Sequence, residues 1–320
     1  MHRDVLKSLI AADDVENAAA LLRKHSDKVQ LTKEMFEEAY IWGETSRKHH
    51  NAYAEYVCKD KAQQLVMLLL QHASARSLMR RRRRHISGYA QREAAIDESL
   101  LLYASGRGHD DIIQRLIEIG VDIDVRSNVY LGIRSRFKVF ETFAMPARKP
   151  LRTMTALECA AAAGHLNAVA ILISNGAKLF YEYETLPTSM VLAVAQGHLK
   201  VVQFLMQRDE KVKYVDAESH LRLVKLAVQN GRCETTKFLL EHRIQVLGHA
   251  RGMAASKDAL QSHRSPSIVV LAMMSGCPDM LEIILSSGFH DGIGVREDLV
   301  TALEYAALMP NASFVYTLLR

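Results

Sequence analysis

Apolar residues occur along the chain in short runs separated by small and polar residues. Runs such as Val169–Ile173 and Val201–Leu205 place apolar side chains three and four positions apart, which is the spacing of one helix face. The longest continuous apolar runs, such as Leu65–Leu70 and Ile268–Met274, are far shorter than the ~20 residues that cross a bilayer. The pattern predicts an array of short helices and no membrane span.

These runs recur with a regular period. The segment 155–177 begins Thr-Ala-Leu-Glu, has Gly164-His165 at its centre and ends Gly-Ala, and the segment 188–206 repeats it around Gly197-His198. Gly164 and Gly197 are 33 residues apart, and Gly197 and Gly231 are 34 residues apart. A constant period of this length is the mark of a repeat architecture.

The repeated segment resembles the ankyrin repeat, whose period is about 33 residues. The resemblance implies two short antiparallel helices per repeat, which bury their apolar faces by stacking on neighbouring repeats. The expected fold is an all-α ankyrin-repeat solenoid of about eight stacked helix pairs with long finger-loop insertions. The expected repeats are 1–29, 31–78, 97–125, 154–181, 186–214, 219–245, 266–290 and 298–320. Two departures are that Glu158 and Glu304 replace the family's His, and that its Pro is missing.

The repeats suggest three parts of the chain. Residues 1–78 hold degenerate N-terminal repeats, 79–96 form a basic insert, and 97–320 form the main array with inserts at 126–153 and 246–265. Val5–Leu22 is expected to be a capping repeat, and Met35–Gly43 and Lys61–Ala73 are expected to be the helices of the next one. Small alanines are expected where first helices approach closely: Ala160, Ala161, Ala193, Ala227, Ala272 and Ala306.

Positive charge is concentrated in two inserts. The formal net charge is +5, yet residues 76–96 contain seven arginines and one glutamate, and residues 126–153 contain seven basic residues and one glutamate. The rest of the chain is net acidic. Because both inserts follow second helices, the resemblance places them in finger loops on one edge, where they would form a positive ridge that attracts an acidic partner.

The two inserts supply most of the candidate partner-binding residues. In residues 129–140, partial alternation predicts a projecting hairpin with three basic side chains on one strand face. The arginine run is interpreted either as a binding site or as a solvated loop or nuclear-import signal. The basic candidates are Arg80, Arg81, Arg82, Arg83, Arg84, Arg134, Arg136 and Lys138.

Other candidates follow from the ankyrin resemblance, which implies that the two positions before each turn glycine face a concave groove. These positions are Gly106 and Arg107, Ala195 and Gln196, Gln229 and Asn230, Met274 and Ser275. Tyr183, near a finger loop, is a further candidate anchor. These side chains are mostly uncharged and suit a moderately apolar protein surface.

No catalytic or metal-binding constellation is predicted. His109, His165 and His198 follow glycines at the start of second helices, which indicates a structural role. The four cysteines, Cys58, Cys159, Cys233 and Cys277, form no CxxC pair, which favours reduced, buried thiols in an intracellular compartment over disulfides or zinc. No cofactor is expected.

The predicted function is a non-catalytic protein-binding scaffold or adaptor, a monomer by itself, in the cytoplasm, the nucleus or both. Its expected partner is a protein with an acidic surface that contacts the concave groove and the basic finger edge. The alternatives are a nucleic-acid or ribonucleoprotein partner for the basic inserts, and an unusual enzyme that uses the groove as a pocket. The salt dependence of affinity separates protein from nucleic-acid binding.

Overall fold

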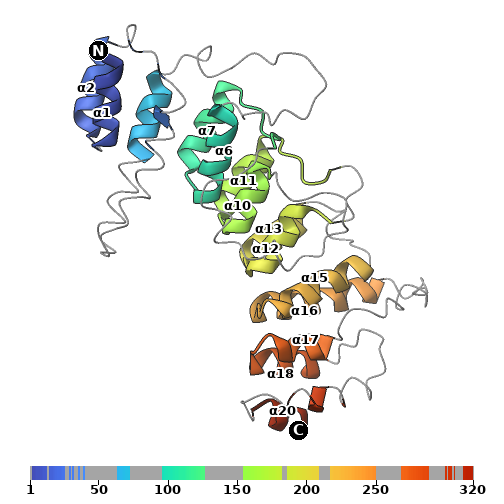
Figure 1. Cartoon of the computed structure of the whole chain (residues 1–320). Coiled ribbons are helices and arrows are strands. Elements are labelled where there is room, and N and C mark those ends of the chain that lie inside the picture. The colour runs from blue at the N-terminus through green and yellow to red at the C-terminus, as the bar shows by residue number, and fades with distance from the viewer. Residues whose placement is uncertain are drawn as a thin grey trace, which may run out of the picture. The chain divides into compact units, whose positions relative to one another are not determined.

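The computed structural model describes residues 2–12, 14–25, 29, 31, 35–36, 39, 63–72, 96–126, 154–181, 186–208, 217–249, 268–287, 300, 302–304, 306 and 313–319. The regular elements within these ranges are α-helices, which confirms the predicted all-α class (Figure 1). By its internal contacts the chain divides into an N-terminal and a C-terminal compact unit. The boundary passes through the helix pair at residues 156–174.

The N-terminal unit begins with two packed helices, α1 (His2–Ala11) and α2 (Val15–His25). Asp14 caps α2, because its carboxylate Oδ1 accepts a hydrogen bond from the Asn17 backbone N–H at 3.1 Å. Leu6, Ile10 and Leu22 form the buried face of this pair. The helix pair spans the predicted capping repeat, and helical residues 63–72 lie within the predicted helix Lys61–Ala73.

The next pair is α6 (Ile96–Arg107) and α7 (Asp110–Ile119). In α7 the buried side chains are Ile112, Ile113 and Leu116, so one face of the helix is apolar, as its spacing predicts. Two aspartates occupy its first turn, where negative charge is favoured by the helix dipole. At the unit boundary lie α10 (Ala156–Ala163) and α11 (Leu166–Ser174).

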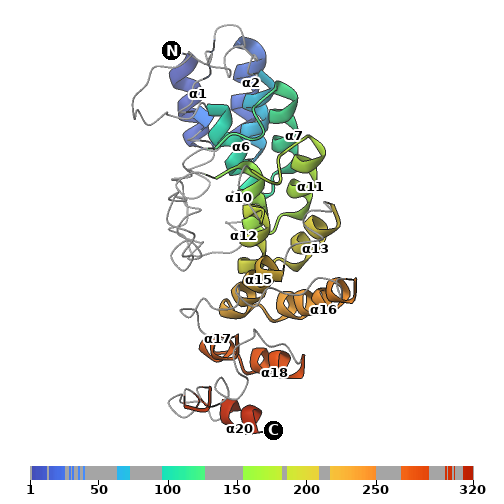
Figure 2. The same ribbon diagram turned by 90° about the vertical axis from the view of Figure 1, so that its right-hand side faces the viewer.

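The C-terminal unit contains α12 (Thr188–Gln196), α13 (Leu199–Arg208), α15 (Ala217–Gln229), α16 (Cys233–His249), α17 (Ile268–Met274), α18 (Pro278–Ser286) and α20 (Ser313–Leu319). Helices α12, α15 and α17 stack in one row, while α13, α16 and α18 stack in a second row (Figure 2). Each repeat therefore gives its first helix to one layer and its second helix to the other. Helix α16 also includes the first four residues of the predicted insert 246–265.

Small residues line the buried side of the first helices. Ala193, Ala227 and Ala272 are fully buried in α12, α15 and α17, and Ala306 is 1% exposed. Ala160 and Ala161 of α10 are also fully buried. A methyl side chain permits close helix approach without a void, so the predicted role of these alanines agrees with their burial.

Candidate functional site

Successive repeats in the C-terminal unit are bridged by the residue that follows each turn glycine. Nε2 of His198 lies 3.1 Å from the carbonyl oxygen of Ala162. Nε of Arg232 donates a hydrogen bond to the carbonyl oxygen of Ala195, also at 3.1 Å. Both acceptors stand two residues before the turn glycine of the preceding repeat. Because a carbonyl oxygen only accepts, His198 carries its proton on Nε2 in this contact.

The turn glycines leave room for these bridging side chains. Gly164 and Gly197 have φ values of 79° and 80°, so both adopt the left-handed backbone that glycine favours. A Cβ atom on Gly197 would lie 2.7 Å from Cδ of Arg232, and one on Gly164 would collide with the His198 ring. Gly231 also has a positive φ, 67°, yet a Cβ there would meet nothing within 4 Å. Gly164 and Gly197 are therefore required both for the left-handed backbone and for the space that the neighbouring side chain occupies. At Gly231 only the left-handed backbone requires glycine.

The next bridging position holds Cys277, whose side chain is shorter than His or Arg. Its Sγ lies 3.5 Å from Sγ of Cys233, the first residue of α16. Sequence analysis missed this pair because the two cysteines are 44 residues apart and fit no local motif. The available signal was their place in the repeat: Cys233 follows its turn glycine by two residues, and Cys277 follows Gly276 directly.

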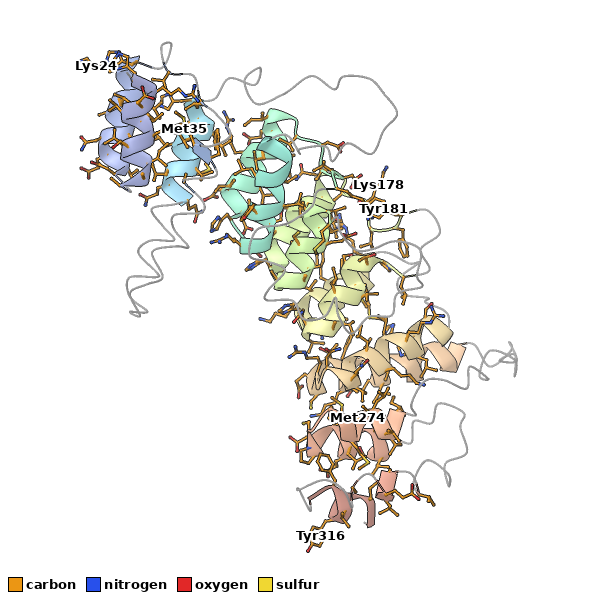
Figure 3. The ribbon with its side chains drawn as sticks, in the orientation of Figure 1. Lys24, Met35, Lys178, Tyr181, Met274 and Tyr316 are labelled. Carbon is orange, nitrogen blue, oxygen red and sulfur yellow. The ribbon has the colours of Figure 1, made fainter. Side chains whose placement is uncertain are left out.

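The expectation that Ala195 faces the concave groove is wrong. Ala195 is fully buried, and Arg232 of the next repeat bonds its carbonyl oxygen. In the two following repeats the same position holds Gln229 and Met274, which are exposed. Met274 is 56% exposed at the end of α17 and is labelled in Figure 3.

The position directly before each turn glycine is half-buried. It holds Arg107, Gln196 and Asn230. The Asn230 side-chain amide donates a hydrogen bond to the Leu226 carbonyl oxygen at 2.8 Å, so one of its donors stabilises its own helix end. These three residues remain predicted partner contacts with partial exposure.

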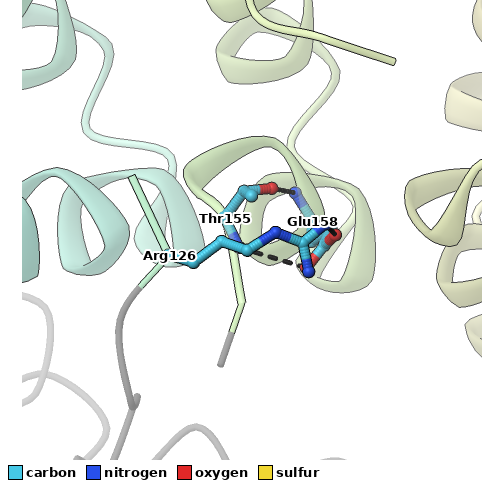
Figure 4. A network of polar contacts seen from close by, with 3 residues as sticks. All are labelled: Arg126, Thr155 and Glu158. Carbon is cyan, nitrogen blue, oxygen red and sulfur yellow. Dashed lines mark hydrogen bonds and ion pairs between the residues drawn. The ribbon is translucent and has the colours of Figure 1, made fainter. Parts of the chain in front are cut away.

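A polar network joins Arg126, the first residue of the insert 126–153, to the residues that follow the insert (Figure 4). Thr155 and Glu158 form a capping box: the Glu158 N–H donates to Oγ1 of Thr155 at 3.2 Å, and the Thr155 N–H donates to Oε2 of Glu158 at 3.1 Å. Nη2 of Arg126 lies 3.4 Å from Oε1 of Glu158. Glu158 is 2% exposed, so its charge is compensated by these donors. The family's His is replaced here by a residue that both caps α10 and pairs with Arg126.

Several predicted site residues lie outside the described residues. These are Arg80, Arg81, Arg82, Arg83, Arg84, Arg134, Arg136, Lys138 and Tyr183. The predicted hairpin at 129–140 and residues 250–265 of the third insert lie outside them as well. The basic ridge therefore stays a prediction from charge and position.

The three Gly-His histidines stand where the repeat pattern places them. His109, His165 and His198 each directly precede a second helix, namely α7, α11 and α13. Burial lowers the pKa of His198 below its ordinary value, and the positive charge of Arg232 lowers it further, while the bond to Ala162 opposes both. Across the ranges described above, no three His, Cys, Asp or Glu side chains gather in a way that could hold a metal ion.

Pairs of short antiparallel helices, stacked in two layers with left-handed glycines between them, define a helical repeat protein. A comparison with protein-family models matches residues 56–216 to ankyrin repeats in three copies. The match spans half of the chain, which therefore belongs to the ankyrin-repeat family. No curated protein sequence matches the chain at a significant level.

Family membership defines the general kind of activity. Ankyrin repeats generally mediate protein–protein interaction, and the family is typically non-catalytic. None of the helices described in the structure has both the length and the apolar character needed to cross a membrane.

Proposed function

We propose that this protein is a binding scaffold that recognises a partner protein with an acidic surface. The partner would contact the basic inserts together with the uncharged side chains at the ends of the first helices. The observation that carries this proposal is the ion pair between Arg126 and Glu158 at 3.4 Å. It brings the residue that begins the insert into contact with the helix that follows the insert.

This contact matters because it places both ends of a strongly basic segment at one point. Residues 127–153 contain six Lys or Arg residues and one Glu. Both ends of this segment are therefore tethered to the same part of the array. Concentrated positive charge raises the association rate with an acidic surface and makes the rate sensitive to salt.

The uncharged part of the proposed surface is formed by the exposed Gln229 and Met274 and by the half-buried Gln196 and Asn230. All four lie in the C-terminal unit at the ends of α12, α15 and α17. A flexible Met side chain adapts to different partner shapes, which suits the apolar centre of an interface.

The test is affinity capture from cell extract, followed by mass spectrometry and then by measured affinity for the captured partner. One variant carries Arg81, Arg83, Arg134 and Arg136 replaced by Glu. A control carries the same charge change at exposed residues of the helices: Arg23, Lys24, Lys200 and Arg208. We expect the first variant to lose affinity by at least tenfold and to show a flatter salt dependence, while the control retains its affinity.

A second pair of variants tests the helix ends. Met274→Glu should weaken binding of an acidic partner, whereas Val5→Glu, an exposed apolar residue of the N-terminal unit at 44% exposure, should not. Unchanged affinity in both charge-reversed and Met274 variants would contradict the proposal. Capture of nucleic acid instead, with a steep salt slope that the insert variant abolishes, would assign the basic inserts to phosphate contacts.

A further inference from the structure

Two thiols of consecutive repeats are in contact in the C-terminal unit. Cys233 is the first residue of α16, and Cys277 is the N-cap residue of α18, so both sulfurs stand at the start of a second helix. Their Sγ atoms are 3.5 Å apart, and both side chains are partly exposed. A small reagent in solvent therefore has access to a preformed pair.

Cys159 offers an internal contrast. It is fully buried in α10, and burial raises the pKa of its thiol far above the ordinary value. A buried, protonated thiol reacts slowly with oxidants, because the thiolate is the nucleophile. Selective reaction at the Cys233–Cys277 pair is therefore expected among these three cysteines.

We propose that Cys233 and Cys277 form a reversible disulfide between adjacent repeats when the protein meets a low-molecular-weight disulfide such as oxidised glutathione. A disulfide requires an S–S distance of about 2.05 Å, so the sulfurs must approach by about 1.5 Å. Helices α16 and α18 already pack against each other, so no gap between the repeats has to be closed.

The reaction proceeds by two thiol–disulfide exchanges. The Cys277 thiolate attacks one sulfur of the small disulfide, forms a mixed disulfide and releases one small thiolate. The Cys233 thiolate then attacks the Cys277 sulfur and releases the second. Two protein thiols are oxidised, one small disulfide is reduced, and the two protein protons end on the released thiols.

The second exchange is favoured by a change in the surroundings of Cys233. Burial, together with the hydrogen bond and the charge of Cys277, raises the pKa of Cys233 to about 11. A mixed disulfide at Cys277 removes the thiol whose hydrogen bond and charge raise the pKa of Cys233, which favours the second step.

The cross-link would join repeats at the junction where the bridging residue is short. At the two preceding junctions, His198 and Arg232 reach a carbonyl of the neighbouring repeat. A covalent bond between Cys233 and Cys277 would supply a stronger tie at the third junction. The proposal concerns the protein's own thiols and is independent of which partner it binds.

The experiment uses the full chain in buffers with graded ratios of reduced to oxidised glutathione. Free thiols are alkylated, and disulfide-linked peptides are identified by mass spectrometry. We expect a Cys233–Cys277 peptide that accumulates as the buffer becomes oxidising and disappears on reduction. Separate glutathione adducts on the two cysteines without linkage, or equal linkage to Cys58 or Cys159, would overturn the proposal.

Three controls separate proximity from general reactivity. In urea all pairings should appear, because unfolding removes the preformed contact. Cys159→Ala should leave the linkage unchanged, whereas Cys233→Ser should trap a glutathione adduct on Cys277. Oxidation should raise the urea midpoint of the parent but not of Cys277→Ala; an unchanged parent midpoint, with the linkage present, would show that the bond does not tie the repeats together.

Discussion

Substituting the turn glycines by alanine separates the cost of a left-handed backbone from the cost of crowding a side chain of the next repeat. Gly197 and Gly231 are equivalent turn residues with φ values of 80° and 67°, so an alanine at either position adopts a left-handed backbone. That conformation costs a non-glycine residue about 1–2 kcal/mol. Gly197→Ala carries a second cost, because its Cβ would lie 2.7 Å from Cδ of Arg232.

The second cost is set by the hydrogen bond that fixes Arg232. Nε of this side chain donates to the Ala195 carbonyl oxygen at 3.1 Å, so the side chain cannot move aside without losing the bond. Arg232 is only half-buried, so this loss amounts to about 1 kcal/mol, less than the ~1.5–3 kcal/mol of a buried hydrogen bond to a charged group. We therefore expect Gly231→Ala to lower the free energy of unfolding by about 1–2 kcal/mol and Gly197→Ala by about 2–3 kcal/mol.

Urea unfolding followed by circular dichroism measures both losses, provided that the denaturant slope stays constant. A double-mutant cycle then assigns the difference. In an Arg232→Ala background the contact is gone, so Gly197→Ala should cost no more than Gly231→Ala. Equal losses in the parent background would refute the close approach of Arg232 to Gly197.

Two further predictions concern the buried polar groups. Glu158→Ala should lower the free energy of unfolding by more than about 2 kcal/mol, because it removes a capping box and leaves Arg126 without this partner. Arg126→Ala should lower the free energy of unfolding less, because that side chain is 36% exposed. Urea unfolding of both variants checks this order. Folding lowers the pKa of His198, so as the pH falls below 6.5 the unfolded chain binds a proton before the folded protein does. The free energy of unfolding should therefore decrease below that pH. Above it, the contribution of His198 to the free energy of unfolding is constant. Urea midpoints at about pH 5 and about pH 7.5 should differ less in His198→Gln than in the parent, and an equal difference would contradict this assignment.

The repeat pattern was predictable because it depends on local spacing. Glycines 33 and 34 residues apart, with apolar positions at helical intervals between them, are enough to place helix pairs such as α12 and α13. The burial of Ala193, Ala227 and Ala272 also follows, since only small residues fit between closely stacked first helices.

Contacts between repeats were harder to predict, because they depend on the register of one repeat on the next. The approach of Cys233 to Cys277 depends on the stacking of α16 on α18 across the insert 246–265. The burial of Ala195 depends on the length of Arg232 in the following repeat. Neither is visible in the spacing within a single repeat. The Thr155–Glu158 box has a recognisable sequence signature, but its pairing with Arg126 does not.

The change in bridging residue along the C-terminal unit implies that its repeats do not open together. His198 and Arg232 tie their repeats to the preceding ones, whereas the reduced Cys277 is too short to reach an equivalent carbonyl. Local opening follows the weakest boundaries of a structure, and in a repeat array each boundary contributes its own term. The amides of α17 and α18 should therefore exchange with solvent deuterium before those of α12 and α13, so that these later repeats of the C-terminal unit open separately from the earlier ones.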